Sequence, residues 1–432
     1  MSTTRQADGG AGGRRRWSLT LAALVTVRLA IPVATLAFSG HALPGLPAYR
    51  FQPLNGDSFG FYAATREFIS SLGRVSKPLL LIAVVLVVGA TVVGVRLWRR
   101  SPDRRWIAVL LPAAALAIAV TLPIHEMRSP GAAVFGWSLL WTLPMIPIRV
   151  VGLDPTPDVA FVIGLVLTLA ALAVTVVGTA YVGRYATGRR AVGMGAATLF
   201  TVWPLVSGQV VGHSAWENGQ WDVDVGLHLY TEPLSTALVV VSVALLLRPA
   251  THQVGHAGAG LAIGYATAVK LTNGLVGLVL ALLVAWRQGL RQALPYAVGG
   301  LVSLPLVVAY WPKGYVGMFD GATSAAPHPW ALTYADDAWR HSLLLTPRLL
   351  LLLAPLLVIG CFSIYDRWLL AVVSTPIVVN AVVYSFYYAT AVHPRFLYVA
   401  LPFVFVLEAA GAASLIDAVR RRRHRLRQVR VL

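Results

Sequence analysis

Residues 78–98 read PLLLIAVVLVVGATVVGVRLW, and this stretch decides the fold class. Its one charged residue, Arg96, lies close to the end of the run. A second run, from Val159 to Val182, contains no charged residue. Each run covers the roughly 20 apolar residues that an α-helix needs to cross a bilayer. The sequence therefore predicts an integral membrane protein built from helices.

The composition of the whole chain of 432 residues agrees with this prediction. Hydrophobic residues make up 57% of the sequence and charged residues 12%, whereas soluble globular domains carry about 25% charged residues. The single cysteine, Cys361, cannot form a disulfide within the chain. Because Cys361 lies inside an apolar run, we expect it to be a packing residue.

The net charge of +18 could indicate a nucleic-acid-binding protein, but the placement of the charges favours a membrane protein. Basic residues fall in short clusters between apolar runs, which is the positive-inside pattern that sets the orientation of spanning helices. We therefore expect both termini in the cytoplasm, a location in the plasma membrane, and contacts with anionic membrane lipids rather than with nucleic acid. The basic clusters are Arg14–Arg16, Arg96 to Arg105, Arg184 to Arg190, Arg287 with Arg291, and Arg420 to Arg430.

The alternation of apolar runs and basic clusters predicts an all-α, polytopic transmembrane bundle of about 12 spans, within a range of about 11 to 13. Residues 1–16 are expected to be a disordered cytoplasmic segment, 17–418 the transmembrane module, and 419–432 a basic cytoplasmic tail. Residues 17–38 could also be a signal peptide, but the run is long and lacks a clear cleavage site, so we expect a retained helix. The other expected helices cover about 78–98, 106–123, 158–183, 191–211, 233–248, 256–286 (two short helices or one kinked helix), 293–311, 344–364, 368–389 and 396–418.

The loops on the external side are predicted to carry most of the acidic residues. An amphipathic helix is expected on the external surface in each of the first two loops, the second at Phe135–Val151. Loops carry function more often than the elements that they join, so we expect the functional residues in these segments. The predicted external loops are 39–77, 124–157, 212–232, 312–343 and 390–395, and they or their borders hold 12 of the 17 Asp and Glu residues: Asp57, Glu67, Glu126, Asp154, Asp158, Glu217, Asp222, Asp224, Glu232, Asp320, Asp336 and Asp337.

Asp57 and Glu232 are the acidic candidates for a site. Asp57 comes just before an amphipathic stretch, so it is either a helix N-cap or a general base that accepts a proton from a hydroxyl group. Glu232 precedes Pro233 at the start of a helix, where an acid and a proline are ordinary starting residues. Upstream of Glu232, acids alternate with Trp residues, as in sugar-binding sites and in interfacial aromatic belts. Four residues there could hold a divalent metal, although their spacing matches no known ligand pattern: His213, Asp222, Asp224 and His228.

Two basic residues are the matching cationic candidates. Lys270 follows a short apolar run, where it could either extend to the interface or form a site at membrane depth. Arg395 lies at the entrance of the last span, as an interfacial anchor or as a group that binds phosphate through two parallel hydrogen bonds. Arg28 lies in the middle of the first span and is expected to face a partner or a cavity.

Five motifs in this order resemble the GT-C superfamily of membrane glycosyltransferases, which includes the protein O-mannosyltransferases and the aminoarabinose transferases of lipid A. The resemblance covers roughly residues 17–418 and selects no subfamily. The first-loop acid is single here, not the acidic pair of some branches. The motifs are Gly56-Asp57-Ser58, the aromatic and proline-rich helix Phe135–Val151, Thr231-Glu232-Pro233-Leu234, Lys270-Leu271-Thr272-Asn273, and His393-Pro394-Arg395-Phe396 followed by Pro402.

The resemblance implies that a sugar moves, with inversion, from a polyprenyl-phosphate donor to the hydroxyl group of a glycan, lipid or protein acceptor in the cell envelope. Asp57 and Glu232 would be the catalytic carboxylates, and Lys270 and Arg395 would bind the donor phosphate. A divalent metal stays an open alternative. Further candidates for contacts with the acceptor or sugar, or for a second carboxylate, are Glu126, Arg66, His213, Trp216, Glu217 and His393.

A secondary transporter or lipid flippase is the competing prediction, because about a dozen spans and cytoplasmic termini suit it equally well. Transporters usually contain internal repeats and ionisable groups at the membrane midplane. The sequence shows no visible repeat, and most of its acids fall in predicted loops. These two features favour the transferase.

Overall fold

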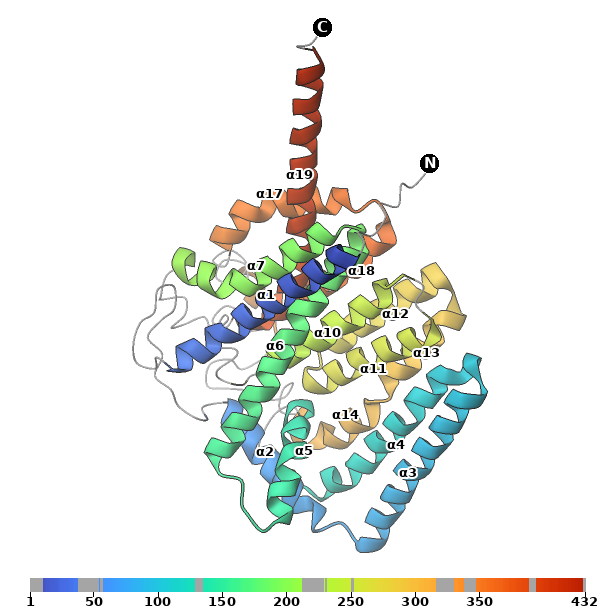
Figure 1. Ribbon diagram of the computed structural model, residues 1–432. Helices are drawn as coiled ribbons and strands as arrows, with labels where there is room; N and C mark the ends of the chain where they lie inside the picture. Colours follow the sequence, from blue (N-terminus) through green and yellow to red (C-terminus); the bar gives the residue numbers. More distant parts are fainter. Residues whose placement is uncertain are drawn as a thin grey trace.

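The computed structural model describes residues 11–37, 54, 57–128, 135–211, 229, 231–249, 252–315, 330–337, 347–387 and 394–429. Within these ranges the regular elements are helices, and the one β contact is an isolated bridge between Trp330 and Tyr387. The predicted all-α class is therefore confirmed. Figure 1 shows the helices packed side by side as a bundle.

Seven segments in the described part of the chain are long and apolar enough to cross a membrane. This finding supports a membrane-embedded protein, while the count of about 12 spans stays a prediction. Four shorter apolar helices accompany them: α7 (Arg190–Val211), α10 (Glu232–Leu247), α12 (Asn273–Gln288) and α17 (Pro347–Ser363). The long segments contain α1 (Ala11–Ala37), α3 (Lys77–Arg100), α4 (Arg105–Glu126), α6 (Pro157–Thr187), α13 (Leu290–Leu301) with α14 (Leu304–Tyr310), α18 (Arg367–Ser385) and α19 (Leu401–Val429).

The two ends of the described chain are more helical than the sequence predicted. Helix α1 begins at Ala11, so residues 11–16 are helical and not disordered. Helix α19 continues through most of the predicted tail and projects beyond the bundle (Figure 1). Arginine is a good helix former, and both basic segments directly adjoin an apolar helix, so the helices continue into them.

Residues 256–286, for which two arrangements were open, form parts of two helices, α11 (Gln253–Val269) and α12. The chain turns at Lys270-Leu271-Thr272 between them. The Asn273 side chain stabilises this break, because its Nδ2 donates to the Ala266 carbonyl oxygen (3.0 Å) and to Ser235 Oγ (2.7 Å). The expected span 293–311 is also divided, since Pro305 lies in the first turn of α14 and cannot donate the hydrogen bond that a continuous helix would need.

Helices α2 (Asp57–Leu72) and α5 (Gly136–Val150) are the two amphipathic helices that the sequence predicted. Helix α5 is not a purely superficial element, since Trp137, Trp141 and Met145 are fully buried. They form a core with the buried face of α2 and with parts of α4, α6 and α14. The position of both helices relative to a membrane stays a prediction.

The larger core unites α6, α7, α10, α11, α12, α18 and α19. Small residues permit close helix contacts in it, as is usual for helices in membranes. A Cβ atom on Gly411 of α19 would collide with the Leu356 carbonyl oxygen of α17. This bundle holds the helix ends that carry the candidate site.

Candidate functional site

Two ion pairs bring together the four charged residues that the sequence singled out most strongly. Arg395 Nη2 lies 2.9 Å from Asp57 Oδ2, and Lys270 Nζ lies 3.1 Å from Glu232 Oε1. The four side chains come from separate elements. Asp57 begins α2, Glu232 begins α10, Lys270 links α11 to α12, and Arg395 belongs to the 3-10 helix η5 (Pro394–Ala400).

The two ion pairs form a single cluster around Phe396. Lys270 Nζ lies 4.9 Å and Arg395 Cζ 5.2 Å from the centre of the Phe396 ring, so both cations contact the same aromatic side chain. Arg395 also interacts electrostatically with Glu232. The cluster therefore contains two acids and two bases, and its formal charges balance.

The four side chains differ greatly in exposure. The Asp57 side chain is 56% exposed, against 11% for Arg395, 6% for Lys270 and 3% for Glu232. Burying a charge is costly unless it is paired, which explains why the interior Lys270 and Glu232 are paired with each other. Asp57 is thus the carboxylate that a ligand could reach, while Glu232 lies behind the cations.

Local structure favours the ionised form of Glu232. As the first residue of α10 it lies at the positive end of the helix dipole, which stabilises an anion. Thr231 Oγ1 donates a hydrogen bond to its Oε2 atom (3.3 Å). Glu232 and Pro233 therefore do begin a helix, as expected for an ordinary helix start. The Glu232 carboxylate also binds Lys270.

Lys270 is held in place by aromatic and polar neighbours. Its Nζ atom lies 4.8 Å from the centre of the Tyr384 ring, which stacks on Phe396 at a centroid distance of 5.3 Å. The hydroxyl groups of Tyr384 and Thr272 are hydrogen-bonded at 2.8 Å. The ammonium group is therefore fixed by its neighbours inside the bundle.

Helix α2 places Asp57 by packing on α5. Its buried residues include Phe61, Tyr62 and Phe68, and the Tyr62 hydroxyl donates to the Pro155 carbonyl oxygen (2.8 Å). Thr65 Oγ1 lies 3.0 Å from the Ser138 carbonyl oxygen of α5. With α2 held in this way, its first residue meets Arg395. Among the described residues, the Asp57 carboxylate pairs with the Arg395 guanidinium group.

Arg28, whose role the sequence left open, helps to position η5. Its side chain is buried, its Nη2 donates to the Tyr398 hydroxyl at 2.9 Å, and its Cζ lies 5.0 Å from the centre of the Phe200 ring. Because Tyr398 belongs to the same short helix as Arg395, Arg28 connects α1 to the site.

An aromatic group next to the charged cluster was missed by the sequence analysis. The Trp330 and Tyr387 rings lie 4.7 Å apart, and Tyr387 meets Phe396 edge-on at 5.0 Å. The Ala331 amide donates to the Phe386 carbonyl oxygen (3.0 Å), which ties residues 330–337 to the end of α18. The aromatic run at 384–388 was an available signal, because Tyr and Trp gather at the ends of spanning helices.

Other candidates do not join this cluster. Arg66 pairs with Asp154 (3.2 Å), which also binds Arg149, in a separate exposed group. Glu126 ends α4 with an exposed side chain, and no hydrogen bond or ion pair among the described residues connects it to the two pairs. The remaining candidates lie outside the described residues: His213, Trp216, Glu217 and His393.

The described part of the chain contains no group of three or more His, Cys, Asp or Glu side chains that could hold a metal ion. The residues proposed for a metal, His213, Asp222, Asp224 and His228, all lie outside that part. No protein-family model, curated protein or solved structure matches the chain. The motifs and the geometry of the cluster are therefore the features of this chain that bear on its function.

Proposed function

We propose that this protein is a membrane glycosyltransferase that moves a sugar from a polyprenyl-phosphate donor to an acceptor hydroxyl on the external face. Both termini would lie in the cytoplasm of a plasma-membrane protein. The observation that supports this best is the contact between an exposed carboxylate, Asp57, and a cationic group formed by Arg395 and Lys270. Sugar transfer from a lipid phosphate needs a base for the acceptor and cations for the departing phosphate.

In the proposed reaction Asp57 accepts the proton of the acceptor hydroxyl. The hydroxyl oxygen attacks the anomeric carbon and forms the new glycosidic bond. The bond between that carbon and the phosphate oxygen breaks, and its electron pair leaves with the polyprenyl phosphate. Attack from the side opposite the phosphate inverts the anomeric carbon.

Arg395 and Lys270 would stabilise the charge that develops on the departing phosphate. Arg395 uses Nη2 to bind Asp57, and a guanidinium group has five N–H donors in a fixed geometry. It can therefore hold Asp57 and a phosphate oxygen at the same time. This shared contact would orient the base relative to the leaving group.

We assign Glu232 a positioning role in place of the catalytic role that the motif implied. Its side chain is 3% exposed and paired with Lys270, so it is poorly placed to reach an acceptor. Its carboxylate would hold the Lys270 ammonium group in place and direct it toward the cluster.

The test is to replace Asp57 with Asn in the purified full-length protein and to follow consumption of a polyprenyl-phosphate sugar with an acceptor. Loss of a positioned general base should reduce kcat by about 100-fold or more. The matched control is Asp154→Asn, which changes a similarly exposed, Arg-paired carboxylate outside the cluster and should leave kcat within about twofold of wild type. Near-normal turnover by Asp57→Asn would refute the assignment of the base.

Transport or flipping of a lipid-linked sugar is the second candidate, favoured by the buried pair of Glu232 and Lys270. Ionisable residues inside membrane bundles often mark transport pathways. Proteoliposomes that contain the labelled donor distinguish the two functions. A transferase releases unglycosylated polyprenyl phosphate when acceptor is added, whereas a flippase changes the accessibility of an intact donor.

A further inference from the structure

A second feature of the bundle is an apolar pocket of about 420 Å³ between α1, α6 and α10. This volume lies in the range of roughly 300–1,000 Å³ that is typical of ligand pockets. The lining side chains are aliphatic along most of its length, including Val25 of α1, Val174 of α6 and Val241 of α10. The Val174 side chain is 42% exposed although it lies near the middle of a candidate span.

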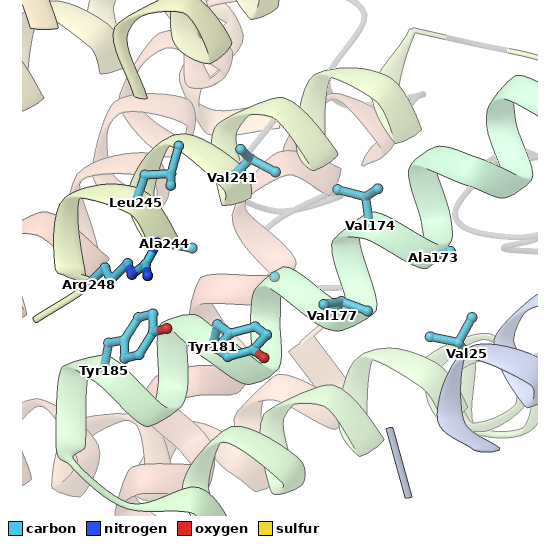
Figure 2. A pocket seen from close by; sticks show the side chains of 11 residues that line it. Val25, Ala173, Val174, Val177, Tyr181, Tyr185, Val241, Ala244, Leu245 and Arg248 are labelled. Carbon is cyan, nitrogen blue, oxygen red and sulfur yellow. The ribbon is translucent and has the colours of Figure 1, made fainter. Parts of the chain in front are cut away.

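One end of the pocket has a different chemistry. Figure 2 shows Arg248 and Tyr185 at this end, Tyr181 next to Tyr185, and Val25 at the opposite end. The Tyr181 ring lies 5.5 Å from the Tyr185 ring and 6.4 Å from the Trp17 ring of α1. Tyr and Trp at the end of spanning helices are typical of the level of lipid headgroups.

The polar end lies far from the candidate active site. Arg248 follows the last residue of α10, and Glu232 is its first residue. A helix of 16 residues is about 24 Å long at 1.5 Å per residue. The Arg248 end of the pocket is therefore about one helix length from Glu232, on the side that the positive-inside pattern predicts for Arg184 to Arg190.

We infer that this pocket binds one anionic glycerophospholipid from the leaflet at that side. An acyl chain would lie along the aliphatic walls, where it is removed from contact with water and packed between helices. The phosphate of the headgroup would accept hydrogen bonds from the Arg248 guanidinium, a geometry that suits phosphate. The Tyr181 and Tyr185 hydroxyls are the further donors at this end.

The choice of an anionic lipid depends on charge complementarity. The pocket lining contains one ionisable cation, Arg248, and no acid. A zwitterionic headgroup would add a positive charge near Arg248, whereas phosphatidylglycerol adds only its phosphate. The inference predicts a preference between two lipids that share the same acyl chains.

The experiment uses the full-length protein in detergent and native mass spectrometry, with phosphatidylglycerol and phosphatidylcholine of identical acyl chains as probes. At the highest-affinity site, the dissociation constant for phosphatidylglycerol should be about tenfold lower than that for phosphatidylcholine. This difference is the effect of one charge-assisted hydrogen bond. Arg248→Gln should abolish this preference. Arg100→Gln is the matched control, since Arg100 is also an exposed arginine at the C-terminal end of a spanning helix, and it should retain the preference.

Ala244→Phe provides a second test, because it places a ring in the pocket and should weaken binding of both lipids about tenfold or more. Arg248 is exposed, so Arg248→Gln should fold, and it remains informative if Ala244→Phe does not fold. Equal preferences in Arg248→Gln and wild type would overturn the inference, as would wild-type binding by a folded Ala244→Phe protein. Displacement of the lipid by inorganic phosphate would also overturn it, in favour of a site for a free anion.

Discussion

The buried pair of Glu232 and Lys270 allows a quantitative prediction about stability. The two charges are 3.1 Å apart, and their side chains are 3% and 6% exposed. At an effective dielectric constant of about 20, their attraction is about 5 kcal/mol. Lys270→Met leaves the Glu232 charge buried without its ion-pair partner, so we expect a loss of about 3–5 kcal/mol in the free energy of unfolding.

The double variant Glu232→Gln with Lys270→Met removes both charges and should recover most of that loss. A cycle of the wild type, the two single variants and the double variant isolates the interaction between the side chains. Unfolding by denaturant in a fixed detergent, followed by circular dichroism, measures each free energy. We expect the double variant within about 1–2 kcal/mol of wild type, because replacing both partners of a buried pair is often nearly neutral.

Arg66→Gln is the control for this cycle, since it breaks the exposed pair with Asp154. Such a pair contributes about 0–1 kcal/mol. The reasoning is refuted if Lys270→Met loses less than about 1 kcal/mol, or if the losses of the two single variants simply add in the double variant.

Two further predictions concern Arg395 and Glu408. Arg395→Lys keeps the positive charge but loses the fixed set of guanidinium donors. The kcat/KM for the lipid-linked sugar should therefore fall about tenfold or more in steady-state assays. An unchanged kcat/KM would show that only the charge of residue 395 matters. The Glu408 side chain in α19 is 1% exposed, and neither of its carboxylate oxygens has a hydrogen-bond partner among the described residues. Glu408→Leu should therefore raise the free energy of unfolding by about 1–3 kcal/mol, and a destabilised variant would reveal a partner for this carboxylate.

Much of the secondary structure could be predicted from the sequence because an apolar run of sufficient length favours a helix wherever it occurs. Helices α3, α7 and α10 lie within a few residues of the expected ranges. The breaks at Lys270 and Val302 were harder to place. They depend on side-chain hydrogen bonds to the backbone, such as the one from Asn273 to the Ala266 carbonyl oxygen. The hydrophobicity of a segment contains no information about such bonds.

The sequence by itself determined the helical, membrane-embedded class and the placement of Asp57, Glu232, Lys270 and Arg395 at helix ends. The length of the apolar runs decides the first, and the alternation of apolar and basic segments decides the second. Only the tertiary structure decided that Arg395 pairs with Asp57, 338 positions away, and that Glu232 is buried while Asp57 is exposed. The physical reason is that helix pairing depends on close side-chain packing between elements distant in the chain, and hydropathy contains no information about which helices meet.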